Sequence, residues 1–384
     1  MIYIYNHCSC EHTLDGIKLC QAHNVSARNY SRAFADSTKL NCSIIAPLLG
    51  DYLSTLLTIH DPVTVALLTL IVPIAFVSIA GNALLIAAVF RDAHMRKAKN
   101  VLLVNLAVAD LATSVLCIPF FVGNIIYRPW LFGMFFCKVS GYMQATFTCC
   151  SSFMLTVLSL DCYLALRRNA ATGSLRNAGL VSGVVWVLAG AVNGIIPYIR
   201  VLQSVKFDCF DLEIAYCVEE WPHSIDLQTY SVSVLIIKYV VPTVVIIVSY
   251  ALVVRTISAD GLHRTSSRRS SSARLSRKRL ARMLIALSVV FVVSWMPYNV
   301  CSLNVDFFSS LVDVRLLPFT ILIGHSNSAL NPVICCYLNR SFRNSVRRML
   351  HCKRPLDERA PDIRRKRIFG CSARKRRCLG MASS

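Results

Sequence analysis

Two charged side chains interrupt long apolar stretches of the sequence, and they have the clearest chemistry to offer. Asp110 lies in the otherwise uncharged run 101–127, and Lys238 in the otherwise uncharged run 227–254. A charge in the middle of a bilayer costs roughly 2.5–3.5 kcal/mol on insertion scales, so each needs a partner or a water-filled cavity. We expect Asp110 to have a buried partner. Lys238 either extends to the membrane surface or, as we prefer, faces a cavity and binds an anionic group.

Histidine and cysteine residues gather near the start of the chain, where they could form a second site. Their spacing matches no standard pattern of metal ligands, so we expect disulfide bonds in an oxidising environment rather than a metal centre. The sequence shows neither a catalytic motif nor a glycine-rich loop that cradles phosphate. We therefore expect neither an enzyme nor a cofactor. The clustered residues are His7, Cys8, Cys10, His12, Cys20 and His23.

Long uncharged runs predict the architecture that positions these residues. Of the 384 residues, 55% are hydrophobic and 16% are charged, against about a quarter charged in an average soluble protein. A membrane helix needs about 20 mostly apolar residues, whereas strands of a membrane barrel have about ten residues of alternating polarity. The long runs do not alternate, so we predict an all-α protein, a seven-transmembrane helix bundle. The runs are residues 63–90, 101–127, 139–160, 178–199, 227–254, 283–305 and 316–339.

The distribution of charge predicts how the bundle is oriented. The chain has 41 Lys and Arg against 20 Asp and Glu, a formal net charge of +21, which alone would also suit a nucleic-acid-binding protein. The cations, however, gather after the first, third, fifth and seventh runs. Because basic loops stay in the cytoplasm, we expect an extracellular N-terminus, contacts with the lipid bilayer and no nucleic-acid partner. The loop between the fourth and fifth runs is acidic, with Asp208, Asp211, Glu213, Glu219, Glu220 and Asp226.

These runs divide the chain into four predicted parts. Residues 1–60 form a poorly ordered extracellular segment with three Asn-x-Ser/Thr glycosylation sites, and residues 61–338 form the bundle. Residues 339–352 fit an amphipathic helix on the inner leaflet, where Cys352 is a candidate for palmitoylation. Residues 353–384 form a disordered, basic cytoplasmic tail. The glycosylation sites are Asn24, Asn29 and Asn41.

Short motifs occur in order along the runs. They are Gly81-Asn82, Leu106 to Asp110, Trp130 to Gly133, Trp186, Pro242 and Tyr250, Phe291, Ser294 to Pro297, and Asn331-Pro332. Together they resemble the rhodopsin-like class of G-protein-coupled receptors, from about residue 60 to about residue 352. The resemblance implies a plasma-membrane receptor that binds an extracellular ligand. Its intracellular partners would be a heterotrimeric G protein and arrestin.

The resemblance also implies a role for the buried acid. In this family the residue that matches Asp110 holds a sodium ion, which acts as an allosteric modulator. The matching partners here are Ser151, Asn327 and Asn331. The alternative is a neutral Asp110 that is held by hydrogen bonds alone.

A disulfide bond on the outer face is a further implication. Cys137 is expected to pair with Cys217, and Cys209 is a competing partner. We prefer Cys217 because the sequence Cys-Val-Glu-Glu-Trp-Pro that it begins resembles the same loop in peptide receptors.

The pocket residues favour a peptide over other ligands. Gln144 stands where receptors for amines carry an Asp, and His325 stands where opsins carry the Schiff-base Lys. The pattern resembles receptors for neuropeptide Y, neuropeptide FF, RFamides and tachykinins, in which an acid matching Asp306 meets an Arg near an amidated C-terminus. The acidic loop either attracts a basic peptide or is simply solvated. The predicted pocket residues are Gln144, Lys238, Trp295, Tyr298, Asn299, Asp306 and His325.

The cytoplasmic ends of two runs depart from the family pattern. Where the family has Asp/Glu-Arg-Tyr, this chain has Asp161-Cys162-Tyr163, and Cys335 replaces the Tyr of Asn-Pro-x-x-Tyr. In the family that Arg contacts the G protein, and that Tyr is linked through water to the residue matching Tyr250. We therefore keep two hypotheses: a signalling peptide receptor, or a binding or scavenger protein with weak coupling or none. The predicted G-protein face comprises Asp161, Cys162, Tyr163, Tyr250, Pro332 and Cys335.

Overall fold

The computed structural model describes most of the predicted bundle and four short strands before it. The strands form two antiparallel hairpins, in which β1 (Asn6–Ser9) pairs with β4 (Gln21–Asn24) and β2 (Thr13–Leu14) pairs with β3 (Ile17–Lys18). Beyond these strands, the described residues are 58–167, 174–207, 212–262, 268–308 and 316–350.

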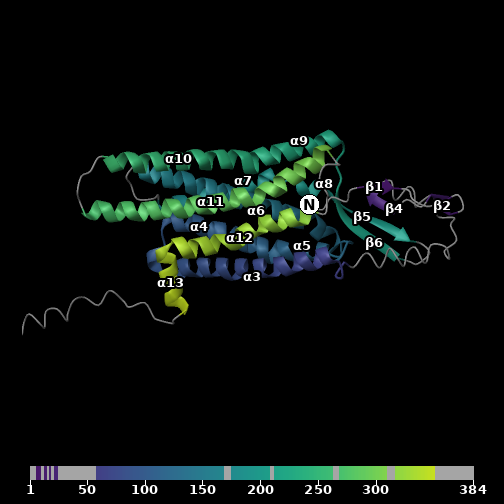
Figure 1. Ribbon diagram of the computed structural model, residues 1–384, viewed down its shortest axis with the longest axis horizontal. Coiled ribbons are helices and arrows are strands. Elements are labelled where there is room, and N and C mark those ends of the chain that lie inside the picture. Colours follow the sequence, from purple (N-terminus) through teal and green to yellow (C-terminus); the bar gives the residue numbers. More distant parts are fainter. Residues whose placement is uncertain are drawn as a thin grey trace, which may run out of the picture. The chain divides into compact units, whose positions relative to one another are not determined.

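Long helices dominate the described chain and lie alongside one another (Figure 1). In two of the helical runs, a single π-helical turn joins two α-helices into one continuous helix. In chain order the helices are α3 (Pro62–Arg91), α4 (Ala98–Ala112) with η2 (Thr113–Cys117) and α5 (Ile118–Ile126), α6 (Gly133–Arg167), α7 (Leu175–Val192) with α8 (Ile196–Ile199), α9 (Ser224–Leu235) with η4 (Ile236–Val240) and α10 (Val241–Leu262), α11 (Arg268–Phe308) and α12 (Leu317–Leu338).

Six of these helical runs are long and apolar enough to cross a membrane, judged by length and composition within the described residues. The remaining one, α12, contains a polar stretch around His325 and Asn331 that lowers its hydropathy. Those polar side chains are buried, and α12 packs between α11 and α3. Large apolar side chains such as Phe76 and Val187 stay exposed on the outer faces, as a lipid-facing surface requires. The predicted helix bundle is therefore confirmed.

Each of the two π-helical turns lies shortly before a proline. The turn η2 ends at Cys117, two residues before Pro119, and η4 ends at Val240, two residues before Pro242. Proline has no backbone N–H and its ring crowds the preceding turn, so the regular hydrogen-bond ladder is interrupted there. A widened turn accommodates the interruption and changes which side chains face inward.

The loop between α8 and α9 contains a β-hairpin, where the sequence had indicated only an acidic loop. Strand β5 (Arg200–Phe207) pairs antiparallel with β6 (Leu212–Glu219), and Leu202 lies opposite Cys217 in the register. The backbone N–H of Trp130 donates to the carbonyl of Ala215 at 2.7 Å. This bond ties the hairpin to the loop that precedes α6.

A further helix, α13 (Arg340–Leu350), lies within the predicted amphipathic segment 339–352. Asn339 precedes it, and its side-chain oxygen accepts hydrogen bonds from the backbone N–H groups of Ser341 and Phe342 at 3.1 and 3.3 Å. Such a cap satisfies N–H groups that have no partner inside the helix. Its placement on the inner leaflet stays a prediction.

Candidate functional site

A cavity of about 200 Å³ lies among the helices that carry the predicted pocket residues. Most of its surface is apolar, and polar and charged side chains lie among the aliphatic and aromatic ones, as is usual for a ligand site. The polar and aromatic residues that line it are Phe120, Phe121, Asn124, Ser140, Gln144, Thr148, Arg200, Glu219, Tyr230, Ser231, Lys238, Tyr239, Phe291, Trp295, Tyr298, Asn299, Ser302 and His325.

The cavity contains all but one of the predicted pocket residues. The exception is Asp306, which is buried on α11 but does not line the cavity. Its backbone carbonyl accepts a hydrogen bond from the Gln228 side chain at 3.3 Å. A direct role of Asp306 in ligand binding stays a prediction. The predicted residues that line the cavity are Gln144, Lys238, Trp295, Tyr298, Asn299 and His325.

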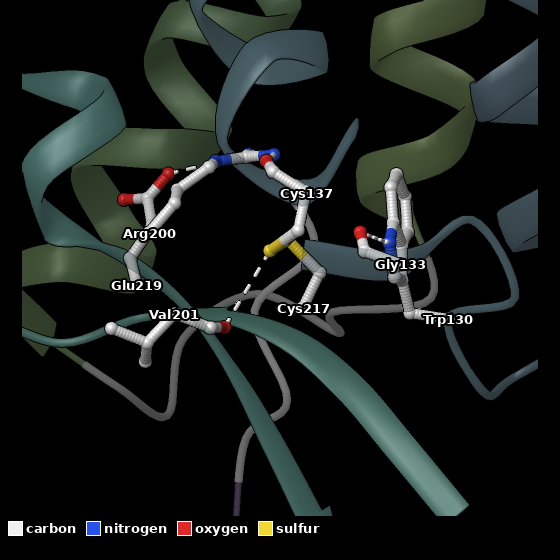
Figure 2. The surroundings of a disulfide bond; sticks show 7 residues. All are labelled: Trp130, Gly133, Cys137, Arg200, Val201, Cys217 and Glu219. Atoms are coloured by element: carbon white, nitrogen blue, oxygen red, sulfur yellow. Dashed lines mark hydrogen bonds and ion pairs between the residues drawn. A yellow bond between two sulfur atoms is a disulfide. The ribbon is translucent and has the colours of Figure 1, made fainter. Parts of the chain in front are cut away.

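An ion pair that the sequence did not reveal forms part of the cavity wall. Arg200 and Glu219 lie directly opposite each other in the β5–β6 register, and Nη2 of the arginine is 3.4 Å from Oε1 of the glutamate (Figure 2). Both side chains are about nine-tenths buried, with exposures of 11% and 10%. Only the acidity of this loop had signalled Glu219, and pairing it with Arg200 required the strand register.

The same hairpin carries the predicted disulfide bond. Cys137 of α6 is bonded to Cys217 of β6, with their Cα atoms 5.5 Å apart (Figure 2). The preference for Cys217 is therefore confirmed, and the competing Cys209 lies outside the described residues. Arg200 also donates to the carbonyl of Cys137 at 3.4 Å. The disulfide and the ion pair thus fix β5 and β6 to the N-terminal part of α6.

Aromatic rings pack around the inward-facing part of α12. The Trp295 ring is centred 5.8 Å from that of Tyr298 and 6.3 Å from that of His325, and the ring of Phe121 is centred 5.7 Å from that of His325. A Cβ atom on Gly324 would lie 2.9 Å from the Trp295 ring. Only glycine therefore lets α12 approach the indole this closely.

Asp110 is the centre of a buried polar cluster between α4, α6 and α12. Its Oδ1 accepts from the Ser328 hydroxyl at 2.9 Å and from the Ser151 hydroxyl at 3.4 Å, and its Oδ2 accepts from Asn331 Nδ2 at 2.7 Å. The structure thus brings together Asp110, Ser151 and Asn331. Ser328 was missed by the sequence reasoning, because nothing in the sequence indicates which of several polar residues on α12 faces α4.

Asn327 behaves differently from the other predicted members of this cluster. It is buried, but it donates no hydrogen bond to Asp110. The side-chain carbonyl oxygens of Asn327 and Asn331 are buried and have no hydrogen-bond partner within the described part of the chain. Such oxygens suit a hard cation, so the residues present fit the implied sodium ion.

The predicted cytoplasmic face contains two buried thiols. Cys162 on α6 and Cys335 on α12 are 5% and 2% exposed, so both replacements point into the helix packing. Asp161 and Tyr163 beside Cys162 are partly buried. Tyr250 on α10 is also buried. A thiol is short and a weak hydrogen-bond donor, so neither Cys162 nor Cys335 replaces the polar reach of the family's Arg and Tyr.

Several predicted modification sites are not described by the structure. Asn29, Asn41 and Cys352 lie outside the described residues, and Asn24 is described only as the last residue of strand β4. Their glycosylation or palmitoylation stays a prediction.

Comparison with known proteins adds an independent assignment. The family described as "7 transmembrane receptor (rhodopsin family)" matches residues 81–335. Neuropeptide Y receptor type 2 of Cavia porcellus is 30% identical over 303 residues, which is 77% of this chain and 78% of that protein. Galanin receptor type 1 of Rattus norvegicus is 29% identical over 283 residues, which is 72% of this chain and 79% of that receptor. The human neuropeptide Y receptor type 2 is 29% identical over 303 residues, again covering 77% and 78%.

Proposed function

Because the chain belongs to the rhodopsin family of seven-transmembrane receptors, we propose that it recognises an extracellular basic or amidated neuropeptide and signals to heterotrimeric G proteins. It is a multi-pass plasma-membrane receptor of the peptide-binding kind and not an enzyme, as the family and its relatives establish. The proposal adds the chemical class of the ligand, an extracellular N-terminus and the route of signalling.

The observation that carries this proposal is the Glu219 carboxylate on the cavity wall. Its Oε1 pairs with Arg200, whereas its Oε2 is buried and has no hydrogen-bond partner among the described residues. A buried acceptor without a donor costs about 1–3 kcal/mol, and more when it is charged. A guanidinium or ammonium group of the ligand would provide that donor. Asp306 and the acidic loop add negative charge that would speed the encounter with a basic peptide.

Gln144 supports the amidated character of the ligand. It lines the cavity on α6, and its carboxamide both donates and accepts hydrogen bonds. A primary amide at a peptide C-terminus also has an N–H donor and a C=O acceptor. It can therefore exchange two hydrogen bonds with the Gln144 carboxamide without either group carrying a charge. An amine ligand would find a neutral group there.

A binding screen tests the proposed ligand class. Cells carrying the full chain would be exposed to labelled amidated peptides, and retained peptide would be measured directly, so that weak coupling cannot hide a ligand. We expect basic amidated peptides to bind, and we expect Glu219→Gln to lower their affinity about tenfold. Glu220→Gln, one residue along, is exposed and should bind as the parent does. A screen in which acidic or neutral peptides alone are retained would contradict the proposal.

A sodium ion at Asp110 is a second element of the proposed function. Asp110 supplies the negative charge, Ser151 supplies a hydroxyl, and Asn327 and Asn331 supply buried carbonyl oxygens without donors among the described residues. These residues of α4, α6 and α12 would hold the ion, whose positive charge would offset the negative charge of the Asp110 carboxylate.

The buried thiols Cys162 and Cys335 favour an alternative function, ligand binding without conventional signalling. Neither thiol offers the charge or reach that the family uses to contact a G protein. Ligand-stimulated nucleotide exchange on purified G protein separates the two functions. Exchange above the unliganded level supports signalling, and binding without exchange supports the scavenger alternative.

A further inference from the structure

We propose that Lys238 is an anion-binding group of the cavity and that the ligand carries a carboxylate that meets it. This inference rests on the proposed function, since it names one chemical group of the peptide that the cavity takes.

The backbone of the widened turn η4 places Lys238 in the cavity wall. Ile236, Ile237 and Val240 of this turn are exposed on the outer, lipid-facing side, whereas Lys238 and Tyr239 line the cavity. The carbonyl of Lys238 accepts a hydrogen bond from Ser152 of α6 at 2.7 Å. The turn is thereby fixed to the neighbouring helix. A π-turn inside a helix often marks a functional position.

The ammonium group of Lys238 is only partly satisfied by the protein. Its Nζ donates to Asn193 Oδ1 at 2.8 Å, and Asn193 is itself fully buried and held by a hydrogen bond to the carbonyl of Ala189. An ammonium has three donors. In the described part of the chain no carboxylate lies within ion-pair distance of this Nζ.

A cation in the membrane interior without a counter-charge is costly, and such residues mark binding paths or pockets. Glu219 shares the cavity with Lys238, but its Oε1 pairs with Arg200 and its Oε2 has no hydrogen-bond partner among the described residues, Lys238 included. The counter-charge is therefore expected from the ligand. The carboxylate of an acidic side chain of the peptide would accept from the ammonium, while the amidated C-terminus remains available to Gln144 in the same cavity. The ligand would then carry opposite charges, a cation towards Glu219 and an anion towards Lys238.

Two small probes of matched shape test this assignment without a known ligand. N-acetyl-L-glutamic acid α-amide and N-acetyl-L-glutamine α-amide both keep the amidated end of the proposed ligand and differ only in the side-chain carboxylate. Each would be titrated against the purified full chain in lipid nanodiscs, and apparent affinity would be taken from the rise in unfolding temperature. We expect the acidic glutamate probe to bind about tenfold more tightly than the neutral glutamine probe. Equal affinity, or no binding of either probe, would overturn the inference.

Variants locate the preference at Lys238. Lys238→Met should reduce the preference for the acidic probe to less than about twofold. Lys238→Arg keeps the cation and should retain the preference. If Lys238→Met does not fold, Lys238→Gln takes its place. Lys138→Met is the matched control, since Lys138 lies on α6 and does not line the cavity. Asn193→Ala removes the hydrogen bond but keeps the charge, so it should also retain the preference. A preference that survives in Lys238→Met or Lys238→Gln would refute the assignment.

The outcomes separate this inference from the proposed function. Peptides that bind the receptor, together with probes that show no preference for the acid, would overturn the role of Lys238 alone. A preference for the acid at Lys238, with no basic or amidated peptide bound in the screen, would overturn the proposed peptide class alone.

Discussion

Arg200 and Glu219 face each other across the paired strands β5 and β6, with 3.4 Å between the guanidinium and the carboxylate. The guanidinium also lies against the backbone of Gly141, where an added Cβ atom would clash with Arg200 Cζ. This pair therefore connects the β5–β6 hairpin, α6 and the ligand cavity. Its two charges stabilise each other, because neither is well exposed to water.

Breaking the Arg200–Glu219 pair from one side should destabilise the receptor strongly. Arg200→Met leaves a buried carboxylate without its counter-charge, which typically costs about 3–5 kcal/mol. Adding Glu219→Gln removes the stranded charge, so the double variant should recover most of the loss. Unfolding temperatures of the parent, both single variants and the double variant measure this coupling. Additive losses in the double variant would show that the two residues do not stabilise each other.

Gly324 should tolerate no side chain. A methyl group there would lie 2.9 Å from the Trp295 ring, which is rigid, so α12 or the indole must move. Overpacking of this kind costs about 1–3 kcal/mol, and Gly324→Ala should lower the unfolding temperature accordingly. Gly183→Ala on α7 is the control, since a Cβ atom there meets nothing within 4 Å and alanine favours a helix. A stability of Gly324→Ala equal to that of the control would contradict the packing described here.

The proposed sodium site predicts a dependence on the type of salt. Replacing potassium chloride with sodium chloride should raise the unfolding temperature of the parent, because an ion that binds only the folded state stabilises it. Asp110→Asn removes the charge and should abolish the difference between the two salts. Equal responses of the parent and Asp110→Asn would exclude Asp110 as the sodium ligand.

Restoring the family residues on the cytoplasmic side tests the signalling hypothesis. Cys162→Arg combined with Cys335→Tyr should increase ligand-driven nucleotide exchange. The two buried thiols stand where the family has an Arg and a Tyr that serve coupling, and the double variant restores both side chains. The comparison requires equal surface expression of the parent and the double variant. Exchange no better than that of the parent would show that these cysteines do not limit coupling.

The helical spans and the buried charge at Asp110 could be predicted from the sequence, because both depend on local composition. Uncharged runs of about 20 residues or more located the helices, because few other structures satisfy the backbone in lipid. The partner of Cys137 was also predicted correctly, but this came from the resemblance of the loop that begins at Cys217. Asp110 stood out because a charge in such a run is costly.

The features that the sequence did not predict depend on register and on helix rotation. Ser328 reaches Asp110 and Asn327 does not, and this difference is set by how α12 rotates against α4. Arg200 could not be paired with Glu219 until β5 and β6 were aligned. The Asn193 partner of Lys238 likewise depends on where the η4 turn aims the side chain, and the sequence only indicated that Lys238 needed one.

The most direct test of the central claim compares one basic peptide from the screen with a twin in which citrulline replaces its arginine. Citrulline keeps the shape and loses the charge, and dissociation constants would be measured on the parent, Glu219→Gln and Glu220→Gln. We predict that the parent and Glu220→Gln bind the arginine peptide about tenfold more tightly, and that Glu219→Gln binds both alike. No discrimination by the parent, or full discrimination by Glu219→Gln, would contradict the proposed recognition of a basic neuropeptide.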